Sequence, residues 1–307
     1  MSIIPLILKL ILGIIRPVFH KIISKRCYHL QGPQGTKPCL RDIDKALRTG
    51  QFQYALRLDI RGYFASIDRK ILLDQLNHHF NDPRLQNYFK QIVQIPIIDN
   101  ADITNPDKGI PIRSTLSNFF GALYLSPLDE AFQNVDGVEY FRFQDDVLIL
   151  TKTEKQFRRA QRVVFDVLRQ LKLKLSHSKS KISPLKSFHF LGIRFTVSLS
   201  QNAKQKPQVS RQLHPRTCQR ALDKINLSYL NAASAAHRQT YLTRWAAWWK
   251  SLRLETVTIA SNLMHFVLHC ISKMELSVAW LARGLLPIKI ACYSLGFLRQ
   301  LISKFGA

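Results

Sequence analysis

The chain has 307 residues, enough for one large domain or for a few subdomains that share a core. Its hydrophobic content of 46% is ordinary for a globular protein and argues against an intrinsically disordered chain. The 45 Lys and Arg residues outnumber the 20 Asp and Glu residues. The resulting formal net charge of +25 indicates a polyanionic partner, nucleic acid first and an anionic membrane second. The alternative is a basic surface that binds nothing.

The cysteines and the apolar N-terminal segment bear on the cellular location and on membrane association. The five cysteines are odd in number and widely spaced, and no Cys-x-x-Cys occurs, so neither a zinc site nor a disulfide framework is supported. Residues 3–15 are apolar but shorter than the roughly 20 residues that a membrane span needs. We expect a core or surface helix there, no membrane association and a cytoplasmic location.

The first clear strand is expected at 54–60, where residue character alternates up to Asp59. Ser66 or Asp68 is expected to cap the helix that follows, because both side chains accept hydrogen bonds from backbone amides. That helix should end at the Asn-Asp-Pro sequence of residues 81–83, since proline interrupts a helix.

The middle of the chain predicts a loop, a helix and a hairpin. Residues 99–109 are polar and rich in turn formers, so they predict a loop, and a helix with one apolar face is expected at 116–128. Two short apolar runs, 140–143 and 147–150, then flank a polar Gln-Asp-Asp sequence. This pattern is typical of a tight β-hairpin.

Farther along, an amphipathic helix is expected at 154–171 and a strand at 188–195. Residues 200–216 are the candidate linker, and the chain beyond them is predicted to be helical. Strands interleaved with helices, followed by helices alone, indicate an α+β catalytic body with a helical appendage.

The adjacent carboxylates of Asp145 and Asp146 are unusual in so basic a chain. On an apolar hairpin they repel each other and lose solvation, and a divalent cation would compensate both effects. If the strand that ends at Asp59 is a neighbour, three carboxylates converge. Such a cluster suits nucleotidyl transfer with two Mg²⁺ ions, one activating a primer 3′-hydroxyl and one binding the triphosphate. The alternative is a simple turn, which Asp favours.

Five segments in order resemble the bacterial reverse transcriptases of the group II intron and retron type. They are RLDIRGYFASID (57–68), GIPIRSTLSNFFGALYLSPLDEAF (109–132), FRFQDDVLIL (141–150), LKLKLSHSKSKI (171–182) and FHFLGIRF (188–195), the last of which resembles the primer-grip hairpin. The resemblance implies a right-hand polymerase fold, α+β, with an antiparallel sheet packed on helices. It implies fingers and palm at 1–199 and a helical thumb at 200–255, and leaves a helical region of unknown role at 256–307.

The resemblance also implies roles for single residues. Asp59 and Asp145 match the two principal metal ligands, and Asp146 matches the accessory carboxylate. Phe64 matches the aromatic gate that selects dNTPs, because a flat ring under C2′ of the sugar leaves no room for a 2′-hydroxyl. The alternative for Phe64 is a core position beside Tyr63.

Basic residues are the expected contacts to the nucleotide. Lys37 lies in a segment, 27–43, that resembles the fingers of this family and would meet the triphosphate. Lys179 matches the basic residue of the fourth motif, which would donate a proton to pyrophosphate, with Lys174 and Lys181 as rivals.

The second motif departs from the family pattern G-x-P-Q-G-x-x-x-S-P. Ile112 replaces Gln, Arg113 replaces Gly and Asn118 replaces Pro. Arg113 would reach a phosphate or crowd the site, because Gly lets the backbone approach more closely. Fidelity, processivity and substrate choice stay open at these positions.

The resemblance implies an RNA-directed DNA polymerase that uses two Mg²⁺ ions, with Mn²⁺ able to substitute. It would extend a DNA or RNA primer with dNTPs on an RNA template, and a dedicated structured RNA would fit as a further partner. The alternative is a non-catalytic RNA-binding or splicing-helper relative. An RNA-making polymerase is disfavoured by Phe64. Mobile-element spread, antiviral defence and sequence diversification are all open settings.

Overall fold

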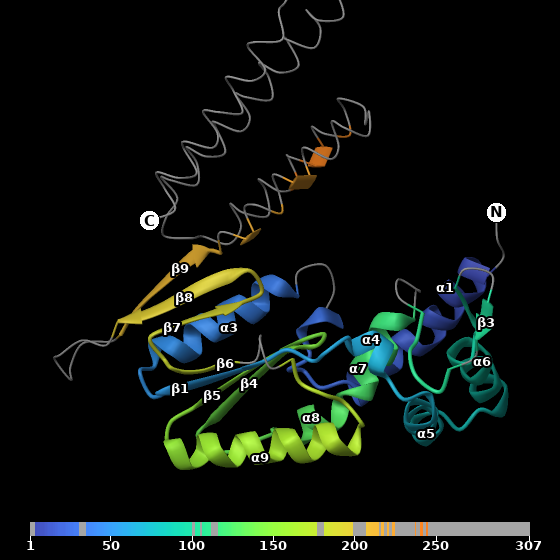
Figure 1. Ribbon diagram of the computed structural model, residues 1–307, viewed down its shortest axis with the longest axis horizontal. Helices are drawn as coiled ribbons and strands as arrows, with labels where there is room; N and C mark the ends of the chain where they lie inside the picture. Colours follow the sequence, from blue (N-terminus) through green and yellow to red (C-terminus); the bar gives the residue numbers. More distant parts are fainter. Residues whose placement is uncertain are drawn as a thin grey trace, which may run out of the picture. The chain divides into compact units, whose positions relative to one another are not determined.

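The computed structural model describes residues 4–30, 35–99, 102–104, 106–111, 116–176, 181–198 and 207–214, with scattered positions between 216 and 244. The chain divides into two compact units, residues 1–191 with 196–209 and residues 192–195 with 210–307. The first unit holds the helices α1 to α9 and the strands β1 to β7 (Figure 1).

The helix expected at the N-terminus is confirmed as α1 (Ile4–Ile15). It buries Ile11 and Ile15 and exposes Leu10 and Ile14, so it is both a core helix and a surface helix. The described residues include no helix with the length and apolarity that crossing a membrane requires. The helical segments that follow are η1 (Arg16–Val18), α2 (Phe19–Ile22), η2 (Tyr28–Leu30) and α3 (Thr36–Arg48).

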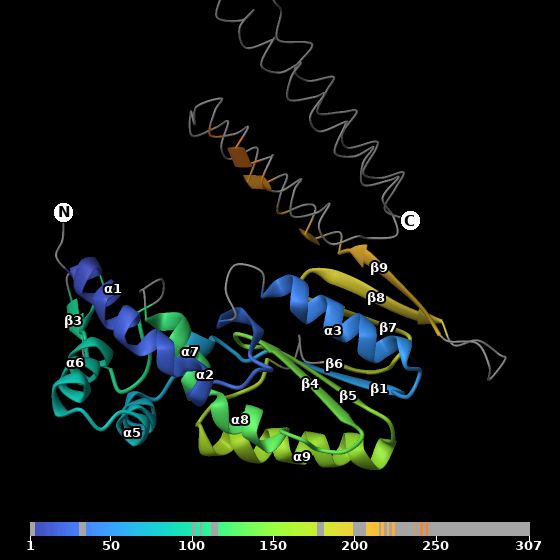
Figure 2. The same ribbon diagram turned by 180° about the vertical axis from the view of Figure 1, so that it is seen from behind.

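A four-stranded antiparallel sheet forms the centre of the first unit. Helices cover both of its faces: α8 and α9 lie on one face and α3 on the other (Figures 1 and 2). The predicted α+β class, with an antiparallel sheet packed on helices, is therefore confirmed. In spatial order the strands are β4 (Val138–Phe143), β5 (Asp146–Thr151), β1 (Tyr54–Leu58) and β6 (Lys181–Pro184).

The helices around the sheet begin at side-chain caps. Asp68, rather than Ser66, caps α5 (Arg69–His79). Its Oδ1 atom accepts hydrogen bonds from the backbone amides of Lys70 and Ile71, each at 3.2 Å. Asp82 caps α6 in the same way, so the Asn-Asp-Pro sequence both ends one helix and begins the next. The other helices are α6 (Pro83–Val93), α7 (Ser117–Tyr124), α8 (Ser126–Ala131) and α9 (Glu154–Gln170).

Several expectations were wrong in detail. The predicted loop at 99–109 contains one strand of a short ribbon, β2 (Ile97–Asp99) with β3 (Asp102–Thr104). The predicted helix at 116–128 is two helices, since Pro127 begins a new helix, α8, after Leu125.

The predicted strand at 188–195 is likewise two strands, β7 (Ser187–Phe190) and β8 (Ile193–Ser198). Leu191 and Gly192 both have positive φ, 48° and 78°, which suits a two-residue hairpin turn. The predicted linker at 200–216 contains β9 (Gln208–Leu213), where Val209 is buried.

Beyond β9 the structure describes only scattered positions, so the predicted helical thumb at 200–255 lies almost entirely outside the described residues. The helical region at 256–307 lies wholly outside them. Both domain assignments stay predictions.

Candidate active site

The register between β1 and β5 sets the position of Asp59. Leu58 faces Val147, and both side chains are buried. One further step along this antiparallel pair brings Asp59, which directly follows β1, to the level of Asp146, the first residue of β5. The strand end at 59 and the hairpin turn at 144–145 are therefore neighbours, as the three-carboxylate hypothesis requires.

The hairpin itself is as tight as predicted. Phe143 pairs with Asp146, which leaves Gln144 and Asp145 as a two-residue turn. Gln144 has a φ of 57°, the left-handed conformation that such turns favour at their first position. Asp145 therefore lies at the tip of the turn, and Asp146 begins the returning strand.

A cation lies next to the second carboxylate of this pair. The Nη2 atom of Arg57, on the neighbouring strand, is 3.9 Å from Oδ1 of Asp146. Across the described ranges, no three His, Cys, Asp or Glu side chains are grouped closely enough to hold a metal ion, these aspartates included.

A buried ion pair lies beneath the hairpin. Arg142 of β4 and Asp129 of α8 are almost fully buried and form a two-pronged contact, with Arg142 Nε donating to Asp129 Oδ1 at 2.6 Å. The Tyr140 hydroxyl donates to the same oxygen at 2.8 Å. Burial lowers the pKa of Arg142, but the Asp129 carboxylate outweighs it and holds that pKa well above its usual range. Arg142 is therefore charged at neutral pH, and its contact with Asp129 ties α8 to the strand that leads into the turn.

The candidate gate residue lies where the first two motifs meet. Phe64, half-buried in α4 (Tyr63–Ser66), accepts a hydrogen bond at its carbonyl from the Ile110 amide, at 3.0 Å. Its ring packs so closely on Gly121 of α7 that a Cβ there would lie 3.0 Å from Phe64 Cε1. Phe64 therefore has a partly exposed ring with a rigid backing.

Tyr63 links this gate region to the turn. Its hydroxyl donates to the Gly121 carbonyl. Burial raises the pKa of Tyr63 well above its usual range, and the charge of nearby Asp145 adds to the effect, while Arg142 opposes it. The Asp145 carboxylate thus lies close enough to Tyr63 to affect it electrostatically.

The sequence match agrees with this arrangement. Residues 2–195 match the family described as reverse transcriptase (RNA-dependent DNA polymerase). The chain belongs to the reverse transcriptase family. The matched residues contain the β1 strand end, the hairpin and the gate region together.

Two solved structures are similar to this reverse transcriptase chain. A telomerase from Candida albicans, in complex with a TWJ fragment of telomeric RNA, is 14% identical over 65% of this chain and 37% of its own, with a TM-score of 0.48. An apo telomerase from Candida tropicalis is 11% identical over 62% of this chain and 38% of its own, with a TM-score of 0.47. This chain therefore spans little more than a third of the length of either. Comparison with curated protein sequences gave no match.

The structure describes only some of the basic residues predicted to contact the nucleotide. Lys37 lies in the first turn of α3 with a partly exposed side chain. The segment containing the rival Lys174 runs beside the Asp59 strand end: the Arg61 amide donates to the Lys174 carbonyl at 2.9 Å, and the Ser176 amide to the Asp59 carbonyl at 2.8 Å. Arg113, Ile112, Lys179 and the Lys181 side chain lie outside the described residues.

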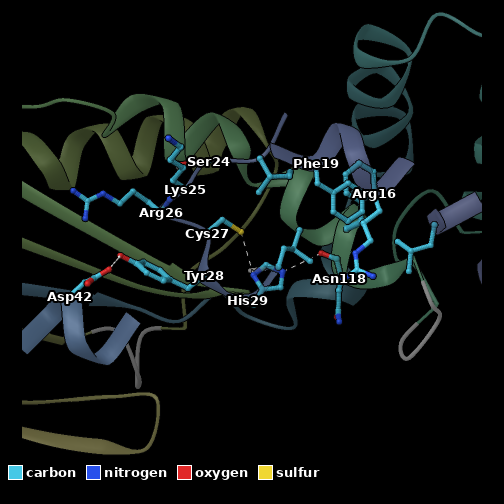
Figure 3. A pocket seen from close by; sticks show the side chains of 14 residues that line it. Arg16, Phe19, Ser24, Lys25, Arg26, Cys27, Tyr28, His29, Asp42 and Asn118 are labelled. Atoms are coloured by element: carbon cyan, nitrogen blue, oxygen red, sulfur yellow. Dashed lines mark hydrogen bonds between the residues drawn. The ribbon is translucent and has the colours of Figure 1, made fainter. Parts of the chain in front are cut away.

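A cavity of about 840 Å³ opens between the N-terminal helical segments and the start of α7 (Figure 3). Three cations, Arg16, Lys25 and Arg26, are among its lining residues, as are His29 and Asn118. His29 joins the cavity wall to the β4–β5 turn, because its Nδ1 atom is 3.0 Å from the Gln144 backbone nitrogen.

Sequence analysis did not assign a role to Arg142, Asp129 or His29. The signal for the ion pair was available: Arg142 interrupts an apolar strand, and Asp129 follows the apolar helix of the second motif. A charge within an apolar run predicts a buried partner of the opposite sign. No local pattern marked His29.

Proposed function

We propose that the chain is an RNA-directed DNA polymerase that extends a DNA or RNA primer with dNTPs on an RNA template. The observation that carries the proposal is the β1–β5 register, in which Leu58 faces Val147 and Asp59 therefore adjoins the turn bearing Asp145. The family match over residues 2–195 supports the same chemistry.

The proposed ligands are carboxylates, whose chemistry suits magnesium. Mg²⁺ prefers hard oxygen ligands and is bound by carboxylates together with phosphates, which is what the ends of β1 and the β4–β5 turn would offer. Asp59 and Asp145 would hold two ions, with Mn²⁺ able to replace Mg²⁺. Asp146, already beside Arg57, would be the accessory carboxylate. Bound ions would activate the primer hydroxyl and neutralise the departing pyrophosphate.

The chain's own residues would select and orient the nucleotide. Phe64, backed by Gly121, presents a rigid ring that would exclude a ribose 2′-hydroxyl. Lys37, Arg113 and Lys179 would contact the triphosphate. The net charge of +25 supports binding to template and primer, since phosphate contacts supply most of the affinity for nucleic acid.

The finer assignment follows the motif resemblance. The order and spacing of the five motifs favour the bacterial group II intron and retron type, which makes a dedicated structured RNA the expected partner. The thiols of Cys27 and Cys39 are free and buried, which fits a cytoplasmic location.

The test is primer extension on poly(rA)/oligo(dT) with Mg²⁺ or Mn²⁺. We expect extension by the wild type and a loss of at least about 100-fold in Asp145→Asn, because an amide no longer supplies the negative charge that the ions need. The matched control is Asp136→Asn, an exposed aspartate in the turn before β4, which should extend as the wild type does. Equal extension by both variants would refute the proposal, and no extension by the wild type would favour the non-catalytic RNA-binding alternative.

A further inference from the structure

The residue just before Asp145 has an unusual backbone. Gln144 has a φ of 57°, in the left-handed region that a residue with a side chain adopts at a cost. Both of its backbone polar groups are held by side chains. Its N–H donates to His29 Nδ1 at 3.0 Å, and its carbonyl accepts from Arg142 Nη1 at 3.3 Å. Two anchors thus stabilise a conformation that the chain would otherwise avoid.

The hydrogen bonds of His29 define its protonation state. A backbone amide only donates, so Nδ1 must be the acceptor, and Nε2 then carries the proton. Nε2 lies 3.2 Å from the carbonyl of Asn118, which accepts that proton. At the end of the ring away from Asn118, the Cys27 sulfur lies 3.4 Å from Nδ1 (Figure 3).

The surroundings keep the ring neutral. Burial, with a smaller contribution from the charge of Arg142, lowers the pKa of His29 to about 4 even though the Asn118 hydrogen bond opposes both. The Cys27 thiol is neutral as well, because burial raises its pKa to about 12. His29 therefore retains its acceptor nitrogen at neutral pH.

The ring also connects separate parts of the site. Its own segment precedes α3, Asn118 lies in the first turn of α7, and Gln144 begins the catalytic turn. Arg142, the second anchor, is fixed in turn by the Asp129 carboxylate of α8. The turn is thus clamped between the α7 and α8 sides of the fold.

We propose that His29 is a positioning residue of the polymerase site: by holding the Gln144 amide against α7, it fixes where the turn presents the Asp145 carboxylate. The inference rests on the proposed polymerase function. It assigns His29 an effect on turnover through Asp145, without contact to substrate.

Three substitutions separate the two hydrogen bonds. His29→Asn places an amide oxygen near the position of Nδ1 and keeps the acceptor for Gln144. His29→Gln places an amide nitrogen near the position of Nε2 and keeps the donor for Asn118. His29→Leu keeps much of the volume and neither bond. Thermal unfolding of each variant shows how far it stays folded.

In primer extension we expect kcat to fall about 10- to 100-fold in His29→Leu and His29→Gln, because small displacements of a reacting group have effects of that size. His29→Asn should stay within about 5-fold of the wild type, and KM for dNTP should change less than about 3-fold throughout. Equal kcat in His29→Leu and the wild type would overturn the proposal. Losses that follow the melting temperatures, with no rescue by Asn, would overturn it too.

Amide hydrogen exchange at the hairpin gives a second readout that needs no activity. We expect the peptide containing Gln144 to lose protection in the Leu and Gln variants and to keep it in the Asn variant. Unchanged exchange in His29→Leu would show that the ring does not hold the turn. If the wild type extends no primer, the proposed function fails, whereas exchange still decides whether His29 holds the turn.

Discussion

Leu58 of β1 and Val147 of β5 face each other across an antiparallel pair, and both are almost fully buried. Because side chains alternate between the faces of a sheet, a slip of one residue would move this apolar pair to the opposite face. Burial of Leu58 and Val147 therefore fixes the register. The register in turn fixes Asp59 beside the turn of Asp145.

Shortening Leu58 should weaken the sheet at this point. We expect Leu58→Ala to lower the free energy of unfolding by about 2–5 kcal/mol, because it removes buried methyl groups and leaves a cavity. Urea denaturation measures the change. Phe165→Ala is the matched control: this side chain is 57% exposed on α9, and its truncation should cost about 0.5 kcal/mol or less.

The buried ion pair beneath the hairpin makes a second prediction. Arg142→Met leaves Asp129 buried without its cation, and we expect a loss of about 3–5 kcal/mol in the free energy of unfolding. The exposed Arg158–Glu154 pair of α9 is the control, because Arg158→Met should cost about 1 kcal/mol or less. Similar losses for the two variants would contradict a special role for the buried pair.

Phe64, whose ring packs on Gly121, is the proposed gate against ribonucleotides. Phe64→Ala should raise the ratio of rNTP to dNTP incorporation by about 10-fold or more, because the ring no longer blocks a 2′-hydroxyl. Primer extension with each nucleotide class measures the ratio. An unchanged ratio would remove Phe64 from the gate.

Gly121→Ala tests the proposed gate by changing the residue on which the Phe64 ring packs. The new methyl would lie 3.0 Å from the Phe64 ring and 3.2 Å from the Tyr63 ring, so both rings must shift. We expect KM for dNTP to rise by about 3-fold or more. Gly13→Ala on α1, where a Cβ meets nothing within 4 Å, is the control and should leave KM unchanged.

His29 predicts a pH dependence of stability. Its pKa falls from 6.5 to about 4 on folding. Between these two pH values the His29 ring is protonated in the unfolded chain but stays neutral in the folded chain. The stability linked to neutral His29 is thus complete above pH 6.5 and is lost as the pH falls towards 4. Its full size is about 3 kcal/mol.

Urea unfolding at pH 7 and pH 5 measures this dependence. The wild type should lose more stability between the two values than His29→Asn, which has no titrating ring. Among the groups near His29, the Cys27 thiol stays neutral and Arg142 stays charged over this range, and both are the same in the two proteins. Equal losses in the two proteins would contradict the lowered pKa of His29.

The local elements could be predicted because their signals are local. The hairpin at 138–151 and the helix at 154–170 follow from apolar patterns within a single window of sequence. The apolar pattern alone missed the break between β7 and β8, because Leu191 continues an apolar run although its backbone turns; the resemblance to the primer-grip hairpin did imply a hairpin there. The β2–β3 ribbon was missed because strands of three residues are too short to show a period.

The candidate site was predictable only in part, for a different reason. Asp59, Asp145, Asp146 and Phe64 lie within the motifs that resemble the family, so the sequence alone identifies them as candidate site residues. The hydrogen bond from the Gln144 amide to His29 joins residues 115 positions apart, and no sequence pattern in either segment predicts it. Arg142 and Asp129 are only 13 positions apart in the sequence. The pair could be predicted only by searching for an acidic partner to the charge that interrupts an apolar strand.

The proposed polymerase function requires that Asp59 and Asp145 hold divalent ions where β1 meets the β4–β5 turn. Fe²⁺ bound in place of Mg²⁺ generates radicals with ascorbate and peroxide, and these cut the backbone nearest the ion. We predict cuts close to residues 59 and 145 in the wild type and in Asp136→Asn, suppressed by excess Mg²⁺ and lost in Asp145→Asn. Cuts confined to other regions, or the same cuts in Asp145→Asn, would contradict the claim.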